Sequence, residues 1–270
     1  MVSATKGTEH YVSRPDGKVY YYKVGQGEPL TLLHNMDWSG WIWRKVIGDF
    51  AQHFTCYNLD LPGYDHSDIP PRKYSVEDYT KAVLDVLDQT GVKRTNIVAF
   101  HGGAFLAVDL AARHPERVNR LVLSGLPFWN KEKGKILWER YFLPSFTDRT
   151  SFDIPVEPLS SWEETHQKEP NLTHERWQKK EEIKKRSRRW TALSFQALCE
   201  HDAEAAALKI KAPTLILNGE GEQVRRTEEK AKAAIKGSIL KVIEGSTGPA
   251  HEEKPDEFAR LVLDFLLARA

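Results

Sequence analysis

The stretch that decides the fold reads Thr95-Asn-Ile-Val-Ala-Phe-His101-Gly-Gly-Ala-Phe-Leu-Ala-Val-Asp-Leu-Ala-Ala-Arg-His114-Pro-Glu-Arg-Val118. Its first part is an apolar run typical of a buried strand, and the part after the glycines has the spacing of an amphipathic helix. Between them, small residues stand two positions before and after His101, at Ala99 and Gly103. Small neighbours let the backbone turn sharply from strand to helix and leave the middle side chain projecting from the turn. His101 is therefore the first candidate for a functional residue.

Similar apolar runs occur along most of the chain and alternate with helical patterns. Strands are predicted at residues 10–14, 18–24, 30–33, 54–59, 97–100, 121–124, 213–217 and 239–243, and further helices at 41–50, 75–91 and 257–267. The helix at 75–91 carries its own start signal, because the Ser75 hydroxyl can accept a hydrogen bond from the amide of Asp78. The alternation of strands and helices with short loops indicates an α/β fold with a mostly parallel, doubly wound sheet.

The composition argues against several classes of protein. The 270 residues include 39 Lys and Arg against 38 Asp and Glu, and this balance gives no reason to expect a nucleic-acid or membrane partner. Cys56 and Cys199 form no metal or redox spacing, and the N-terminus lacks the apolar run of a signal peptide. We expect a cytoplasmic protein, a monomer or homodimer, that takes a small-molecule substrate.

The interval 126–208 departs from the regular alternation. We predict that it forms a helical cap, inserted into a core made of residues 1–125 and 209–270. Its basic run at residues 179–189 is expected to be a solvated helix face, with Glu181–Lys185 and Glu182–Arg186 pairs one turn apart. The interval has no clear strand and holds five of the eight tryptophans, namely Trp129, Trp138, Trp162, Trp177 and Trp190.

The turn around His101 resembles the nucleophile elbow of the α/β-hydrolase fold superfamily, where the middle residue is Ser, Cys or Asp. Asp60-Leu-Pro-Gly-Tyr-Asp-His-Ser67 is similar to a second motif of that family. The motif order and the insertion resemble its capped branch, which includes proline iminopeptidases and epoxide hydrolases. The resemblance implies a mostly parallel eight-stranded sheet flanked by helices, with an inserted helical cap. It also implies that this chain has the family's framework without its usual nucleophile.

The resemblance extends to the two backbone amides that stabilise a developing oxyanion. Leu32-Leu-His-Asn-Met36 resembles the family's His-Gly turn and assigns one amide to Met36, while Gly102, after the elbow, supplies the other. Each such donor stabilises a transition state by about 3 kcal/mol. Asn35 replaces the family's glycine, and we expect it to be tolerated because asparagine accepts a left-handed backbone.

The acid and base positions depart from the family pattern to different degrees. Glu222 occupies the acid position and is one methylene longer than the usual Asp. A gap-free count back from Pro255 places Gly248 where the family has its catalytic histidine. A rival alignment, with a shortened loop, makes His251 the base instead.

One hypothesis explains both departures together. An imidazole at position 101 projects toward the space that Gly248 leaves empty, where Glu222 can orient it as a general base. The simpler alternative is a decayed site in which His101 only fills a hole. No metal and no cofactor are expected. The abundance of tryptophan favours a small apolar or aromatic carbonyl substrate, and the predicted substrate-binding residues are Asn35, Asp37, Trp38 and Trp129.

Three functions therefore stand open. The first is an enzyme that uses His101 as base or nucleophile on a carbonyl compound, including proton abstraction without a cofactor. The second is an ester or lactone hydrolase, with His101 as nucleophile or His251 as base. Such a hydrolase could have been engineered from a parent enzyme with a Ser-His-acid triad. The third is a non-catalytic ligand-binding protein on a degenerate hydrolase fold.

Overall fold

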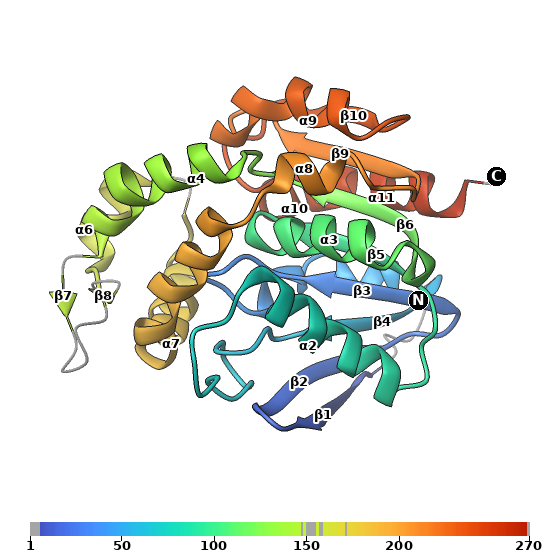
Figure 1. The fold of residues 1–270 in the computed structure, drawn as a ribbon, viewed down its shortest axis with the longest axis horizontal. Helices are drawn as coiled ribbons and strands as arrows, with labels where there is room; N and C mark the ends of the chain where they lie inside the picture. The colour runs from blue at the N-terminus through green and yellow to red at the C-terminus, as the bar shows by residue number, and fades with distance from the viewer. Residues whose placement is uncertain (1–5, 147, 150–154, 157–158, 171, 269–270) are drawn as a thin grey trace.

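The computed structural model describes residues 6–146, 148–149, 155–156, 159–170 and 172–268 (Figure 1). An eight-stranded sheet forms its centre, with the strand order β1-β2-β4-β3-β5-β6-β9-β10. The first two strands pair antiparallel and the remaining six run parallel, which confirms the mostly parallel sheet. The strands are β1 Thr8–Arg14, β2 Gly17–Val24, β3 Glu28–Leu33, β4 Phe54–Leu59, β5 Thr95–Phe100, β6 Val118–Ser124, β9 Thr214–Gly219 and β10 Ile239–Ile243.

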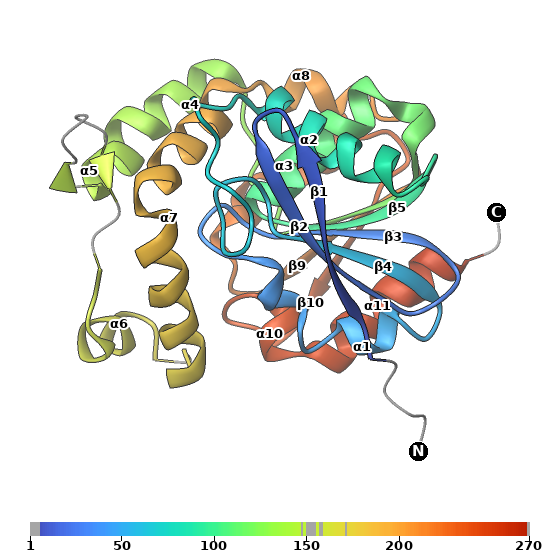
Figure 2. The same ribbon diagram turned by 90° about the horizontal axis from the view of Figure 1, so that it is seen from below.

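Helices cover both faces of the sheet (Figure 2). One face carries α2 Val76–Gln89, α3 Gly102–Arg113 and α8 Ala203–Ala207, and the other carries α1 Ile47–Phe50, α10 Ala250–Glu253 and α11 Pro255–Leu267. Short turns η2 Pro115–Arg117 and η4 Gln223–Thr227 and the helix α9 Glu228–Ala234 complete this part of the chain. The central strands β5 and β9 are buried at every position, which is why they read as continuous apolar runs rather than alternating ones.

Two of the helix predictions have clear outcomes. The Ser75 cap is confirmed, because Ser75 Oγ accepts from the Asp78 amide while the Asp78 carboxylate accepts from the Ser75 amide. The single helix expected at 41–50 is wrong. This segment forms the 3-10 turn η1 Gly40–Trp43 and the short helix α1, and both bury apolar residues, which produced the helical spacing.

The inserted segment between β6 and β9 is mainly helical and lies beside the edge where the parallel strands end (Figure 1). It contains α4 Lys131–Leu137, η3 Trp138–Phe142, α5 Leu143–Ser145, α6 Trp162–Lys168 and the long helix α7 His174–Glu200. A two-stranded ladder of β7 Asp148–Arg149 and β8 Pro155–Val156 interrupts it, although no strand was expected there. We call the segment from α4 to α7 the cap; α8, which follows it, packs against α3 of the core.

The basic run of α7 does not form the solvated face that its composition suggested. Arg186 Nη1 lies 2.8 Å from Asp65 Oδ1, and Lys179 Nζ lies 3.0 Å from Asp65 Oδ2. Because Arg186 turns toward the core, the expected Glu182–Arg186 pair is replaced by a contact of Glu182 with Lys179. Burial alone would raise the pKa of the Asp65 carboxyl, but the hydrogen bond and charge of Lys179 outweigh it and hold that pKa below its usual range. Ion pairs thus join the cap to the core.

None of the helices in the described ranges is both long and apolar enough to span a membrane.

Candidate active site

The elbow is the most strained point of the site. His101 has a φ of +44° and a ψ of −110°, between the last residue of β5 and the first residue of α3. A non-glycine residue at positive φ is disfavoured, and such strain persists only where the surrounding structure enforces it. Here the His101 amide bonds to Ser124 in β6 and its carbonyl accepts from Phe105 in α3. The strand-to-helix turn predicted from the sequence is present, with the imidazole at its apex.

Glu222 faces this imidazole. It follows β9 on a short loop, so it lies at the same edge of the sheet as the elbow. Its Oε2 is 3.6 Å from His101 Nε2, and its side chain is only 3% exposed. Within the described residues neither carboxylate oxygen of Glu222 has a hydrogen-bond partner, and neither does His101 Nε2. Because a buried carboxylate without a partner is costly, the pair is poised to form a charge-assisted hydrogen bond after a small adjustment.

Gly125 makes room for this pair and was missed in the sequence. A Cβ at this position would lie 2.3 Å from His101 Cδ2 and 2.5 Å from Glu222 Oε2, and its φ is +57°. Only glycine accepts both the close approach and the backbone conformation. The sequence did offer a signal for it. Gly125 directly follows β6, the neighbour of the elbow strand β5, at the edge where ligands bind in parallel sheets.

His251 lies in α10, inside the core. It is 1% exposed, and its ring packs against Trp43, Phe100 and Phe258. Burial, followed by nearby positive charges led by that of Arg176, lowers the pKa of His251 well below its usual value of 6.5. A separation of 3.6 Å between His101 and Glu222 leaves no space for a further ring between them, so His251 does not bridge the pair as the rival alignment requires.

Gly248 lies in the loop before α10, beside the Glu222 loop. The Gly221 amide donates to Ser246 O at 2.7 Å, and a Cβ on Gly219 would lie 2.6 Å from Gly248 O. A Cβ on Gly248 itself would lie 3.0 Å from Glu253 Oε1, the end of a side chain. The position that the gap-free count assigns to the family histidine is therefore close in space to the Glu222 loop.

The oxyanion-hole region holds an unexpected contact. The Gly102 amide donates to Asn35 Oδ1 at 2.8 Å. Among the described residues the Met36 amide has no hydrogen-bond partner. The expected reason for Asn35 is wrong, because its backbone is not left-handed; in the described part of the chain only Asp65 and His101 are non-glycine residues with positive φ. Instead, the side chain of Asn35 makes hydrogen bonds with the Gly102 amide and with Asp37.

His34 fixes the shape of this loop. Its Nε2 accepts from the Leu61 amide at 2.8 Å, so its Nδ1 donates to Asn35 O at 2.6 Å. Burial lowers the pKa of His34, which keeps the ring neutral in this arrangement. The His34 ring holds the loop through these two hydrogen bonds. Among the described contacts, none joins it to the His101 imidazole.

The other predicted substrate-binding residues separate into two places. Asp37 accepts from Asn35 Nδ2 at 2.6 Å and lies 3.3 Å from Lys180 Nζ of the cap. Trp38 stacks near Trp41, with Arg176 and Lys180 of α7 over its ring. Trp129 is away from this group: its ring is buried against Phe105 and its N–H donates to Leu198 O. Trp129 thus stabilises the junction between core and cap.

Among the described residues, one group of side chains has the spacing of a metal site. It consists of Asp60, Asp65 and His66. Each carboxylate is already engaged, Asp60 by the Gly40 amide and His66, and Asp65 by Lys179 and Arg186. The two cations would repel a metal ion, so these residues fit ion pairing better than metal binding.

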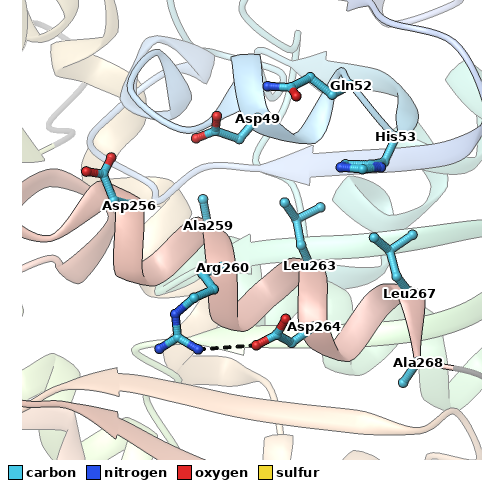
Figure 3. A pocket seen from close by; sticks show the side chains of 10 residues that line it. All are labelled: Asp49, Gln52, His53, Asp256, Ala259, Arg260, Leu263, Asp264, Leu267 and Ala268. Atoms are coloured by element: carbon cyan, nitrogen blue, oxygen red, sulfur yellow. Dashed lines mark hydrogen bonds and ion pairs between the residues drawn. The ribbon is translucent and has the colours of Figure 1, made fainter.

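The cavities in the described structure include a groove of about 650 Å³ between α1 and α11. Asp49, Gln52 and His53 line one wall. The other wall is formed by one face of α11 and by Ala268, which follows that helix (Figure 3). None of the predicted site residues lines it. A second cavity of about 480 Å³ lies between α4 and α7, where Trp138 and Cys199 contribute apolar surface.

Comparison with known proteins agrees with the geometry. The sequence profile of a family described as "alpha/beta hydrolase fold" matches residues 28–255. The pimeloyl-(acyl-carrier protein) methyl ester esterase of Aliivibrio fischeri is 29% identical over 142 residues, which cover 52% of this chain and 53% of that enzyme. The match therefore spans about half the length of that relative.

Two further similarities cover more of the chain. Epoxide hydrolase 1 of Caenorhabditis elegans is 21% identical over 280 residues, covering 95% of this chain and 69% of that protein. The crystal structure of a hydrolase from Pseudomonas aeruginosa PA01 superposes with a TM-score of 0.79 at 20% identity, covering 99% of this chain and 100% of that one. At this identity the structural likeness shows the fold alone.

Proposed function

Because the chain belongs to the alpha/beta hydrolase fold family, we propose that it is an enzyme acting on a small carbonyl compound, with His101 as the reacting base and Glu222 as the group that orients it. The observation that carries this proposal is the 3.6 Å separation of His101 Nε2 and Glu222 Oε2 at the elbow. The relatives named as an esterase and an epoxide hydrolase support an enzyme rather than a binding protein.

In this proposal the two ring nitrogens of His101 have different roles. A neutral imidazole has one donor and one acceptor nitrogen. With the Nε2 proton directed at Glu222, Nδ1 keeps the lone pair and removes a proton from the carbon beside the substrate carbonyl, or from a water molecule that attacks it. The imidazolium formed in this step is stabilised by the buried carboxylate, and the charge on the carbonyl oxygen by the amides of Gly102 and Met36.

Direct attack by His101 on an activated ester is the second candidate. The position of His101 at the apex of the elbow supports it, because that is where the family's nucleophile stands. Nδ1 would form a bond to the ester carbonyl carbon as the bond to the alkoxide oxygen breaks. The alkoxide would take up the Nε2 proton, and water would then hydrolyse the resulting acyl-imidazole to the acid and free imidazole. The free, buried thiols of Cys56 and Cys199 support placing the reaction in a reducing, cytoplasmic compartment.

The test combines kinetics with a chemical readout. p-Nitrophenyl acetate turnover is measured for the wild type, His101→Ala and Glu222→Gln, and the peptide containing His101 is examined by mass spectrometry for an acetyl group. We expect His101→Ala to lower kcat by at least about 100-fold and Glu222→Gln by about tenfold, since general bases contribute factors of this order. Deuterium incorporation beside the carbonyl of an aryl methyl ketone in D2O tests proton abstraction separately.

His114→Ala is the matched control, because His114 is a solvent-accessible histidine at the other end of the same helix. It should leave turnover unchanged. Full activity of His101→Ala together with its loss in His251→Ala would favour the rival alignment. Wild-type protein with neither ester turnover nor deuterium incorporation would instead identify a ligand-binding protein.

A further inference from the structure

The side chain of Asn35 occupies the place where a substrate oxygen would bind. An oxyanion is stabilised by donors about 2.7–3.1 Å away. Asn35 Oδ1 is 2.8 Å from the Gly102 nitrogen, so a neutral amide oxygen of the protein satisfies the donor that the elbow supplies. A Cβ on Gly102 would lie 2.7 Å from Met36 Cγ and 2.9 Å from Asn35 Oδ1, which shows how closely the loop approaches this amide.

Two further contacts hold Asn35 in this position. Its Nδ2 donates to Asp37 Oδ1 at 2.6 Å, and Asp37 Oδ2 lies 3.3 Å from Lys180 Nζ in the cap helix α7. The series Gly102, Asn35, Asp37 and Lys180 therefore connects the elbow to the cap. In addition, Leu198 of α7 would lie 3.1 Å from a Cβ on Gly102, so the cap also contacts the elbow directly.

We propose that Asn35 is a specificity-determining plug, whose carboxamide must leave the Gly102 amide before a substrate oxygen can bind there. The inference deepens the proposed function. Its kinetic effect rests on that function, whereas the hydrogen bond between Asn35 and the Gly102 amide does not depend on it. Asn35 withdraws by rotation of its side chain, and its bond to Asp37, which the cap supports through Lys180, opposes that rotation.

The plug discriminates between substrate oxygens by their charge. A hydrogen bond to an ionised acceptor is roughly twice as strong as one to a neutral acceptor. A weakly polarised ester carbonyl gains little by replacing the amide oxygen of Asn35, because one neutral acceptor replaces another. A substrate whose oxygen becomes an enolate, or already carries negative charge, displaces Asn35 readily. The site thus favours acidic carbonyl compounds, such as 1,3-dicarbonyls, over simple esters.

Amide hydrogen exchange tests the plug without any substrate. In Asn35→Ala the Gly102 amide loses its acceptor, and we expect its exchange to accelerate at least about tenfold by NMR. The Phe105 amide, which bonds to His101 O in the first turn of α3, should keep its rate and reports that the helix is intact. Unchanged exchange of Gly102 in a folded variant would overturn the proposal.

Kinetics on two substrates test the consequence for specificity. Asn35→Ala should raise kcat/KM for p-nitrophenyl acetate by about tenfold and raise much less the rate of deuterium incorporation into acetylacetone, a 1,3-dicarbonyl whose oxygen becomes an enolate, so the ratio between the two rates changes. Lys180→Met should move that ratio in the same direction by a smaller factor. A fall in both rates would show that Asn35 assists the reaction and would overturn the plug.

The matched control is Asn130→Ala, which also removes an asparagine oxygen from a helix-terminal amide, that of Lys133, but in the cap. It should change neither the exchange of Gly102 nor the substrate ratio. The double variant His101→Ala with Asn35→Ala separates the two proposals. Fast Gly102 exchange with retained turnover would refute the role of His101 and support the plug. Slow exchange with lost turnover would refute the plug and support the role of His101.

Discussion

Lys179 Nζ and Asp65 Oδ2 lie 3.0 Å apart, and this contact joins the cap helix α7 to the loop that follows β4. Asp65 is 7% exposed and also contacts Arg186 of the same helix. A single buried carboxylate therefore balances two cap cations. This charge is one of the contacts that hold the cap against the core.

We expect Asp65→Asn to lower the free energy of unfolding by about 3 kcal/mol at pH 7, because it leaves Lys179 and Arg186 without their buried counter-charge. The pKa of Asp65 is depressed, so its contribution is present above the unfolded value of 3.8 and is lost as the pH falls through the folded value. Urea unfolding at pH 7 and pH 3 should show the difference shrinking. Asp264→Asn removes an exposed partner of Arg260 and should cost less than about 0.5 kcal/mol.

Gly125→Ala should damage the site more than the fold. The added methyl group would overlap the His101 ring and force it away from Glu222, and we expect kcat to fall at least about tenfold. Gly237→Ala is the control, because Gly237 shares the positive φ but has no heavy atom within 4 Å of an added Cβ. Both variants should lose about 1–2 kcal/mol from backbone strain. Equal turnover of the two variants by stopped assay would contradict the role assigned to Gly125.

His101→Ser alone should be a poor esterase, because no base stands beside the new hydroxyl. Adding Gly248→His places an imidazole next to the Glu222 loop, and we expect ester turnover of the double variant to exceed that of His101→Ser by at least about 100-fold. Glu253 must shift slightly to admit the new side chain. A fluorophosphonate probe that labels only the double variant would identify the activated serine, and equal labelling of both would contradict the prediction.

His251→Phe should change how stability depends on pH. The pKa of His251 is depressed by burial and then by positive charge from Arg176, Arg44 and Lys45. Below the usual pKa of 6.5, His251 binds a proton in the unfolded chain but not in the folded chain. The free energy of unfolding therefore falls as the pH falls. We expect the variant to avoid up to about 1.4 kcal/mol of this loss between pH 7.5 and 5.5. Parallel unfolding curves of variant and wild type over this range would show that His251 is protonated in the fold.

The sheet and the elbow could be predicted from the sequence because their signals are local. Buried strands such as β5 and β9 are continuous apolar runs, and the elbow needs small residues within two positions of His101. The position of Glu222 beside the elbow could also be predicted, because its loop directly follows a recognisable strand. Each of these features depends on neighbours in the chain.

The features that could not be predicted depend on contacts between distant residues. Asn35 and Gly102 are 67 positions apart, and a substitution of glycine by asparagine suggests a backbone requirement rather than a side chain that reaches the elbow. The partners of the α7 basic run were missed for the same reason, since Asp65 lies far from it in sequence and nearby glutamates looked like its partners. Trp129 looked like a substrate contact because the packing of the cap was unknown.

The positive φ of His101 has a consequence for how this protein can change over time. A histidine held at +44° costs the fold roughly 1–3 kcal/mol that glycine at the same position would not cost. Selection for stability alone would therefore favour glycine at this position, the residue that already stands at the next two positions. Any benefit that the protein gains from His101 must come from its side chain, because its backbone conformation costs stability.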